Sequence, residues 1–408
     1  MASVTVAGGN GLVFNIKLDS SANVALAKNL AGSITAGVQS GTLFPVIATG
    51  VPLPTVPAGT FGYLEQTTDG ISKMTPQYKV LVDTAASATV FGGGGAHQSV
   101  LSSQGNLTYF SGGDSGELVA GGGNNFFQGS SSDRAWSIYT GNGNDTILAG
   151  AGNVTIGAGA GDNYISLGSG NDLVNSAGND TIQGGSGSAT VGVTGSGDVL
   201  VNGGSGMLTF LNGSGMSTVS GGTGSATIFG GAGGGVFSGG SAGNNLIYSG
   251  AQATTIYGGG SGDQLFAIGS ANVQITAGAG NETLNAGGSS GNDSLTAGSG
   301  NDSMQAGTGA DTLTAGTGDA TITGGATGHD LFQFINGQAG GTDLIQSFNV
   351  NPASGDLVGL VGYGPTAIAD ALASQTSSAA GVTITLNDST KVTFANVSHL
   401  TSSNFTSS

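Results

Sequence analysis

The chain has 408 residues, of which 82 are glycine, 23 are acidic and 6 are basic, so its formal net charge is −17 at pH 7. A charge of this sign argues against nucleic acid and anionic membranes as partners. The absence of cysteine excludes a disulfide framework. No segment approaches the roughly 20 consecutive apolar residues that span a bilayer, so we expect no membrane insertion.

Residues 1–85 differ from the rest of the chain, because glycine is sparse there and most of the prolines fall in this range. Alternating apolar and polar residues predict a strand or hairpin over 4–18. Residues 20–30 favour a short helix with a serine N-cap, and we expect strands near Tyr63 and over 77–82. We interpret this range as a small α+β domain that either caps the following coils or acts as an assembly module.

Residues 86–333 carry a repeat in which an apolar residue follows a glycine-rich loop at almost every ninth position. Clear copies read GNGNDTI at 141–147, GSGNDLV at 168–174 and GTGADTL at 307–313. This period excludes helix. It predicts a parallel β-roll, or β-solenoid, in which a short strand points one apolar side chain inward and glycines turn the chain. Two repeats then complete one coil, and stacking of coils buries the apolar face.

The repeats resemble the nonapeptide G-G-x-G-x-D-x-U-x of RTX proteins, whose parallel β-helix binds calcium. The resemblance covers roughly the C-terminal three quarters of the chain. It implies an all-β fold, several bound Ca²⁺ ions and a secreted protein, and it specifies the biological role only weakly. In low-calcium cytosol the repeats are expected to be disordered, and to fold in the millimolar calcium outside the cell.

Residues with carboxylate or amide oxygens stand two positions before many of the apolar anchors. Loops of repeats i and i+2 stack on the same edge, so they present backbone carbonyls and carboxylates, the hard ligands that calcium prefers. The candidate ligands in these loops are Asp145, Asp162, Asn163, Asp172, Asp180, Asp263, Glu282, Asp293, Asp302, Asp311, Asp319 and Asp330. Asp293, Asp311 and Asp330 occupy alternate repeats and should form the best sites.

The middle repeats, between residues 184 and 275, keep the glycines and the anchors but have mostly lost the carboxylates. The expected anchors there include Ile256, Phe266 and Ile275, with sparse metal near Asp263. We expect these coils to stack with little or no metal.

Residues 334–408 are predicted to form a C-terminal β cap. The segment 329–364 resembles the strands that follow RTX repeats, and 381–405 resembles the uncleaved signal that type I secretion systems read. The first residues lack the basic start and apolar core of a secretory signal peptide, so the export address is expected at the other end. We therefore expect the type I secretion machinery as a partner, and a secreted, extracellular or cell-surface location.

Sequence motifs for catalysis are weak. There is no H-E-x-x-H, and the only histidines are His97, His329 and His399. Two G-x-S-x-G matches, at 239–243 and 287–291, lie inside repeat loops rich in glycine and serine, without the strand–turn–helix context of a nucleophile elbow. We therefore expect a protein that is not an enzyme.

Two functions remain open. The leading hypothesis is a structural protein that self-assembles into an extracellular fibre, a surface layer or a biofilm matrix, with calcium driving folding and assembly. The alternative is a calcium-dependent adhesin or glycan-binding module that contacts a cell-surface glycan. An outward ladder of aromatic residues would favour the alternative, and Phe229, Tyr248 and Tyr257 suggest one.

Overall fold

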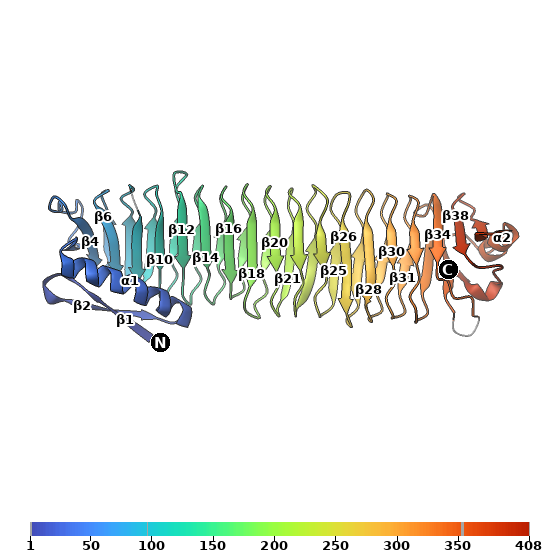
Figure 1. Ribbon diagram of the computed structural model, residues 1–408, viewed down its shortest axis with the longest axis horizontal. Coiled ribbons are helices and arrows are strands. Elements are labelled where there is room, and N and C mark those ends of the chain that lie inside the picture. Colours follow the sequence, from blue (N-terminus) through green and yellow to red (C-terminus); the bar gives the residue numbers. More distant parts are fainter. Residues whose placement is uncertain (1, 96, 352–354, 408) are drawn as a thin grey trace. The chain divides into compact units, whose positions relative to one another are not determined.

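The structure is a computed structural model that describes residues 2–95, 97–351 and 355–407 (Figure 1). The chain divides into two units, unit 1 (Met1–Met207) and unit 2 (Leu208–Ser408). Both units consist mainly of short parallel strands that alternate between two sheets, with few helical residues. This confirms the prediction of an all-β parallel β-solenoid.

In unit 1 the strands from β4 onward alternate between two parallel sheets, which we call 1A and 1B, and β3 pairs directly with β4 in sheet 1A. Sheet 1A contains β3 (Leu43–Ile47), β4 (Phe61–Gln66), β6 (Tyr78–Asp83), β8 (Gln98–Ser102), β10 (Gly116–Val119), β12 (Ala135–Tyr139), β14 (Asn153–Gly157), β16 (Asp172–Ser176) and β18 (Ala189–Val193). Sheet 1B contains β5 (Gly70–Lys73), β7 (Ser87–Phe91), β9 (Asn106–Phe110), β11 (Phe126–Gln128), β13 (Thr146–Leu148), β15 (Tyr164–Ser166), β17 (Thr181–Gln183) and β19 (Leu200–Asn202).

The register of these strands explains the nine-residue period. From β4 onward each strand pairs with the strand two further along the chain, so that Ile147, Ile165, Ile182 and Val201 stand in line across sheet 1B. All four side chains are buried between the sheets. Burying one such side chain contributes about 1.5–3 kcal/mol, and the contribution needs a neighbouring coil on each side. The stacked column is therefore the core of the solenoid.

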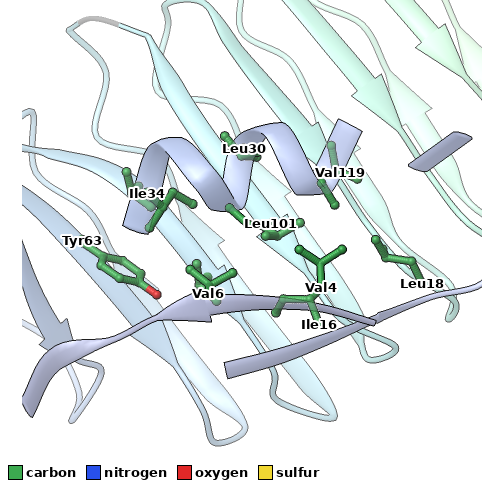
Figure 2. Close-up of a cluster of buried hydrophobic side chains, with 13 residues drawn as sticks. Val4, Val6, Ile16, Leu18, Leu30, Ile34, Tyr63, Leu101 and Val119 are labelled. Atoms are coloured by element: carbon green, nitrogen blue, oxygen red, sulfur yellow. The ribbon is translucent and has the colours of Figure 1, made fainter. Parts of the chain in front are cut away.

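An additional layer covers part of sheet 1A in unit 1. Strands β1 (Ala2–Ala7) and β2 (Val13–Leu18) form an antiparallel hairpin, closed by the one-turn helix η1 (Gly9–Gly11) and followed by helix α1 (Ser21–Ser40). Figure 2 shows the interface, where Ile16 of β2 and Ile34 of α1 belong to one buried cluster with Leu101 of β8. The cluster attaches this layer, which we call the N-terminal layer, to the coils.

In unit 2 the strands again alternate between two sheets, 2A and 2B, as far as β35, and β36 to β38 all belong to sheet 2A. Sheet 2A contains β20 (Leu208–Leu211), β22 (Ala226–Phe229), β24 (Leu246–Tyr248), β26 (Gln264–Gly269), β28 (Thr283–Ser289), β30 (Ser303–Gln305), β32 (Thr321–Thr323), β34 (Thr342–Gln346), β38 (Lys391–Ala395), β37 (Gly381–Thr385) and β36 (Thr376–Ser378). Sheet 2B contains β21 (Met216–Ser220), β23 (Gly234–Ser238), β25 (Thr254–Tyr257), β27 (Val273–Thr276), β29 (Ser294–Thr296), β31 (Thr312–Thr314), β33 (Leu331–Ile335), β35 (Leu357–Val361) and β39 (Phe405–Ser407).

The C-terminal part of unit 2 ends the parallel stack. Strand β38 pairs in parallel with β34, whereas β37 pairs antiparallel with both β38 and β36. Helix α2 (Ala367–Ala373) and the short helix η2 (Ser402–Asn404) lie in the segments that connect these strands. An antiparallel hairpin beyond the last parallel strand covers an edge that would otherwise be free to pair with another chain.

Three sequence-based expectations differ from the structure. The helix predicted over 20–30 begins after the N-cap Ser20 but continues to Ser40, because its apolar face packs on sheet 1A, and it ends at Gly41 with φ 74°. The anchor expected at Phe266 is instead Leu265, which is fully buried. The β-roll was expected to begin at residue 86. Parallel pairing already begins at β3, in a part of the chain without the nonapeptide repeat.

No helix in the part of the chain that the structure describes is both long enough and apolar enough to cross a membrane.

Candidate calcium sites

Three predicted ligand positions of sheet 2B, together with one residue that was not predicted, form a buried ladder of carboxylates. Asp293 N donates to Asp311 Oδ1 over 2.7 Å, and Asp311 N donates to Asp330 Oδ1 over 3.0 Å. Asp330 N donates in turn to Asp356 Oδ1 over 3.0 Å. We call these four residues the 2B ladder. Each carboxylate lies two residues before a buried anchor and links its own coil to the preceding coil.

A second ladder runs along sheet 2A and consists of Asn245, Asp263, Glu282, Asp302 and Asp343, which are all buried. Asn245 N donates to Asp263 Oδ1 over 2.8 Å, and Glu282 N donates to Asp302 Oδ1 over 2.9 Å. Because Leu265 is the anchor of its coil, Asp263 occupies the ordinary ligand position. We call this set the 2A ladder.

Unit 1 has a ladder in sheet 1B, which consists of Asn125, Asp145, Asn163 and Asp180. Asn125 N donates to Asp145 Oδ1 over 2.7 Å, Asp145 N to Asn163 Oδ1 over 2.9 Å, and Asn163 N to Asp180 Oδ1 over 3.0 Å. Asp172 lies apart from this ladder in sheet 1A, where its Oδ1 accepts a hydrogen bond from a backbone N–H of β14.

Two further predicted ligands, Asp162 and Asp319, also lie off the buried ladders. Both side chains are exposed, and the backbone N–H of each donates to an asparagine one coil earlier. Asp319 Oδ1 also accepts a hydrogen bond from Thr342 N over 2.7 Å, which places it beside the buried Asp343. The structure therefore separates an outer column of exposed side chains from the buried ladders.

Hydrogen bonding divides the ladder carboxylates into two groups. In four of them Oδ1 accepts from the preceding coil and Oδ2 accepts from a glycine N–H of the residue's own loop; these are Asp263, Asp302, Asp311 and Asp330. In the described part of the chain, other oxygens of the ladder carboxylates are buried without a hydrogen-bond partner, namely Asp145 Oδ2, Glu282 Oε1 and Oε2, Asp293 Oδ2 and Asp343 Oδ2. These oxygens are free to bind a cation.

The proton affinity of these carboxyl groups reflects their burial. Burial, together with the neighbouring carboxylates of Asp302 and Asp263, raises the pKa of Glu282 from 4.5 to about 8. Burial and the nearby charge of Asp319 raise the pKa of Asp343 from 3.8 to about 7. A buried carboxylate without a donor must be neutralised by a proton or by a cation. Lysine and arginine are absent between Arg134 and Lys391, so that cation has to come from solution.

The loops also supply backbone carbonyl oxygens, because successive glycines stack closely. A Cβ atom on Gly298 would lie 1.9 Å from the carbonyl oxygen of Gly278, and one on Gly300 would lie 1.7 Å from that of Gly280. Any side chain at these positions would push the coils apart. The glycine-rich loops therefore bring rows of carbonyl oxygens beside the ladders.

The donor set fits calcium. Glu282, Asp293 and Asp343 in unit 2 and Asp145 in unit 1 offer hard, unpartnered oxygens, which is the chemistry that Ca²⁺ requires. Within the described residues no three acidic or histidine side chains form a common group. Backbone carbonyls would therefore have to complete each coordination shell. A bound ion would supply the positive charge that the buried carboxylates lack.

Sequence reasoning missed several ladder residues, including Asn125, Asp343 and Asp356. A signal for the last two was present, because Asp343 stands two residues before the buried Ile345 and Asp356 two residues before the buried Val358. The longer loops of this region break the nine-residue period and hide the repeat. The same spacing rule, applied without the period, would have found both.

The residues considered for catalysis do not converge in the structure. Ser241 lies in the turn between β23 and β24, and Ser289 ends β28, so neither serine lies on a strand–turn–helix connection. His97, His329 and His399 are all exposed.

Comparison with known families agrees with this geometry. The family model of the RTX calcium-binding nonapeptide repeat (four copies) matches residues 139–174, 176–188, 239–267, 269–289 and 287–322. Most of the ladder carboxylates lie in these ranges, and the carboxylate-poor coils between 189 and 238 do not match. No curated protein and no solved structure matches the chain.

The chain carries RTX calcium-binding nonapeptide repeats, which bind Ca²⁺ at multiple sites. This class of repeat indicates a secreted calcium-binding protein.

Proposed function

We propose that this protein is a calcium-binding structural protein that self-assembles outside the cell into a fibre, a surface layer or a biofilm matrix. Calcium would drive folding and assembly together, because ions that bind the folded coils stabilise the surface through which copies associate. The solenoid fold is typical of structural proteins, and the residues considered for catalysis do not converge.

The proposal depends chiefly on an apolar patch on the outer face of sheet 1B. The patch consists of Phe91, Phe110 and Phe126, with Phe91 39% exposed and the other two half-buried. Ile71, which is 61% exposed, lies on the neighbouring strand β5, opposite Thr89. The rings of Phe91 and Phe110 stack with centroids 4.8 Å apart, and Phe110 contacts Phe126 at 5.8 Å. Contiguous exposed apolar side chains on a soluble protein are typical of an interaction surface.

Association through this apolar face is more favourable than pairing between the edge strands of two copies. Strand β3 ends sheet 1A and contains Pro45, which lacks a backbone N–H. Strand β5 ends sheet 1B and carries Lys73, a residue that discourages pairing with another chain. We therefore propose that copies associate side by side through the patch.

The C-terminal segment supports a route of export. We propose that residues 381–405 are recognised by a type I secretion system. In the structure this segment includes β37 and β38, so export would require it to be unfolded. Low cytosolic calcium would keep the repeats unfolded until they leave the cell.

One observation favours the second candidate, a glycan-binding adhesin. Phe229, Tyr248 and Phe266 form an outward stack on sheet 2A, with centroids 5.3 and 4.6 Å apart. Tyr257, which we expected in this ladder, lies on β25 of sheet 2B, because successive repeats alternate between sheets. Sugars bind aromatic rings through their faces, and here neighbouring rings cover most of those faces. The structural role is therefore preferred.

Electron microscopy and sedimentation of the purified chain, in millimolar calcium and in chelator, test the proposal. The wild type should form ordered assemblies in calcium and lose them in chelator. The double variant Phe91→Thr/Phe110→Thr should stay dispersed in calcium, whereas the matched variant Phe229→Thr/Tyr248→Thr should still assemble. Dispersed wild-type particles in calcium would contradict self-assembly. Binding of the wild type to a glycan array, lost only in the second variant, would establish the adhesin.

A further inference from the structure

The connection between β2 and α1 contacts a repeat loop of the coils in unit 1. Asn142 N donates to Asp19 Oδ2 over 3.0 Å. Asn23, in the first turn of α1, donates through Nδ2 to the carbonyl oxygens of Thr140 at 2.8 Å and Ala120 at 3.3 Å. The N-terminal layer is thus held at one end to the loop that leads into β13, which carries the repeat GNGNDTI.

Three side-chain oxygens at this contact are buried and have no hydrogen-bond partner in the described chain: Asp19 Oδ1, Thr140 Oγ1 and Asp145 Oδ2. Thr140 is 2% exposed and Asp145 is 1% exposed. The other oxygen of Asp145 already accepts hydrogen bonds from Asn125. Two carboxylates and a hydroxyl therefore present unused oxygens at one buried place.

The three side chains are close neighbours. A Cβ atom on Gly141 would lie 2.4 Å from Asp19 Oδ1 and 2.4 Å from the carbonyl oxygen of Gly121, so both oxygens face the same glycine. The charge of Asp19 acts on the Asp145 carboxyl, and the Thr140 hydroxyl lies beside that carboxyl. The Thr140 hydroxyl nevertheless forms no hydrogen bond of ordinary geometry.

A bound divalent cation would neutralise the two carboxylates and would bind the oxygens that have no hydrogen-bond partner. Two neighbouring carboxylates repel each other when both are ionised, and burial increases the cost. In the part of the chain that the structure describes, no lysine or arginine forms an ion pair with either group. Carboxylate, hydroxyl and carbonyl oxygens together are the ligand set that Ca²⁺ prefers over softer metals.

We propose that a calcium ion binds between Asp19, Thr140 and Asp145, with the Gly121 carbonyl oxygen beside them, and fastens the N-terminal layer to the coils. This site differs from the repeat sites because one of its ligands, Asp19, comes from outside the repeats. It makes the docking of α1 depend on calcium. The inference is independent of self-assembly and requires only that the chain binds calcium.

The number of calcium ions bound per full-length chain, measured by equilibrium dialysis with metal analysis, tests the site. Asp19→Asn keeps an oxygen that can accept the hydrogen bond from Asn142 but removes the charge, so it should bind one ion fewer than the wild type. Asp69→Asn is the matched control, because the exposed Asp69 also accepts a backbone hydrogen bond, from Ser87 N at 2.8 Å. This control should bind the wild-type number.

Hydrogen exchange of Ser21–Ser40 gives a second readout. Calcium should slow exchange of α1 in the wild type and in Asp69→Asn, but not in Asp19→Asn, while the coils gain protection in all three. An unchanged ion count in Asp19→Asn, with full calcium-dependent protection of α1, would overturn the proposal and leave Asp19 as a cap of the Asn142 backbone.

A third variant keeps the proposal testable if Asp19→Asn does not fold. Thr140→Val is nearly isosteric and retains the backbone carbonyl that Asn23 contacts. It should weaken one site about 10-fold, as expected when a group that supports a metal is lost. Unchanged affinity at every site in this variant would likewise overturn the proposal.

Discussion

Acid should stabilise the calcium-free protein, because its buried carboxyl groups bind protons more tightly when the chain is folded. Burial raises the pKa of Glu282 from 4.5 to about 8 and that of Asp343 from 3.8 to about 7. A raised carboxyl pKa means that the folded form holds more protons than the unfolded form. The resulting stabilisation is complete below the ordinary pKa and is lost as the pH rises through the raised value. In chelator, the free energy of unfolding should therefore fall between about pH 5 and pH 8.

Replacement of Glu282 by glutamine isolates one of these groups. Ionising this carboxyl inside the fold costs on the order of 4 kcal/mol at pH 8, given the size of the change in its pKa. Glutamine avoids that cost but buries an unpartnered amide, which costs about 1–3 kcal/mol. In chelator at pH 8, Glu282→Gln should therefore be more stable than the wild type by roughly 2 kcal/mol. In millimolar calcium the order should reverse, because glutamine lacks the charge that holds the ion.

Urea unfolding followed by circular dichroism, at pH 5 and pH 8 with calcium or chelator, measures both effects. A fixed concentration of a stabilising osmolyte, present in every sample, keeps the calcium-free chain folded at the start of each titration. Glu117→Gln is the matched control, because Glu117 is only partly buried on β10, and it should behave as the wild type. Wild-type stability that is equal at pH 5 and pH 8 in chelator would refute the reasoning. A Glu282→Gln variant that retains the full pH dependence of the wild type would refute the assignment to this residue.

Three further predictions concern the ladders, the core and the loops. Changing Asp293, Asp311 and Asp330 of the 2B ladder to alanine should raise the calcium concentration needed for folding. Changing them to asparagine should raise it less, because the amide oxygens still accept the backbone hydrogen bonds. A calcium titration followed by circular dichroism measures both shifts. Phe237→Ala should cost about 3–5 kcal/mol in urea unfolding, because this side chain is fully buried on β23. Gly298→Ala should lower the melting temperature, because its Cβ would meet a carbonyl oxygen at 1.9 Å, whereas Gly32→Ala, in an open position of α1, should gain about 1 kcal/mol.

Periodicity predicted the coils well wherever one side chain per repeat faces a closed core. Ile147, Ile165 and Ile182 stand in line as expected, because stacking in register is the only way to bury them. The start of the stack was not visible, since β3 to β6 pair in parallel without glycine-rich loops of constant length. The strands there pair because they are buried, as β4 is. The sequence of β4 carries no nonapeptide signature that would have indicated this pairing.

The candidate sites were predictable in position but not in hydrogen bonding. Spacing alone placed Asp311 and Asp330 on one edge, and the structure brings them together. The spacing could not show that both oxygens of Asp311 accept backbone hydrogen bonds whereas neither oxygen of Glu282 accepts one. That difference depends on the exact course of each loop. The contact between Asp19 and the loop before β13 was equally invisible, because it joins segments more than a hundred residues apart.

Calorimetric titration of the purified chain with calcium at pH 7, repeated in buffers of different ionisation enthalpy, tests the central claim most directly. It reports the number of calcium ions bound and the number of protons released. If calcium replaces protons on the buried ladder carboxylates, several ions should bind and at least about one proton should leave, chiefly from Glu282, whose pKa is about 8. Absence of calcium binding, or binding without proton release, would contradict the account.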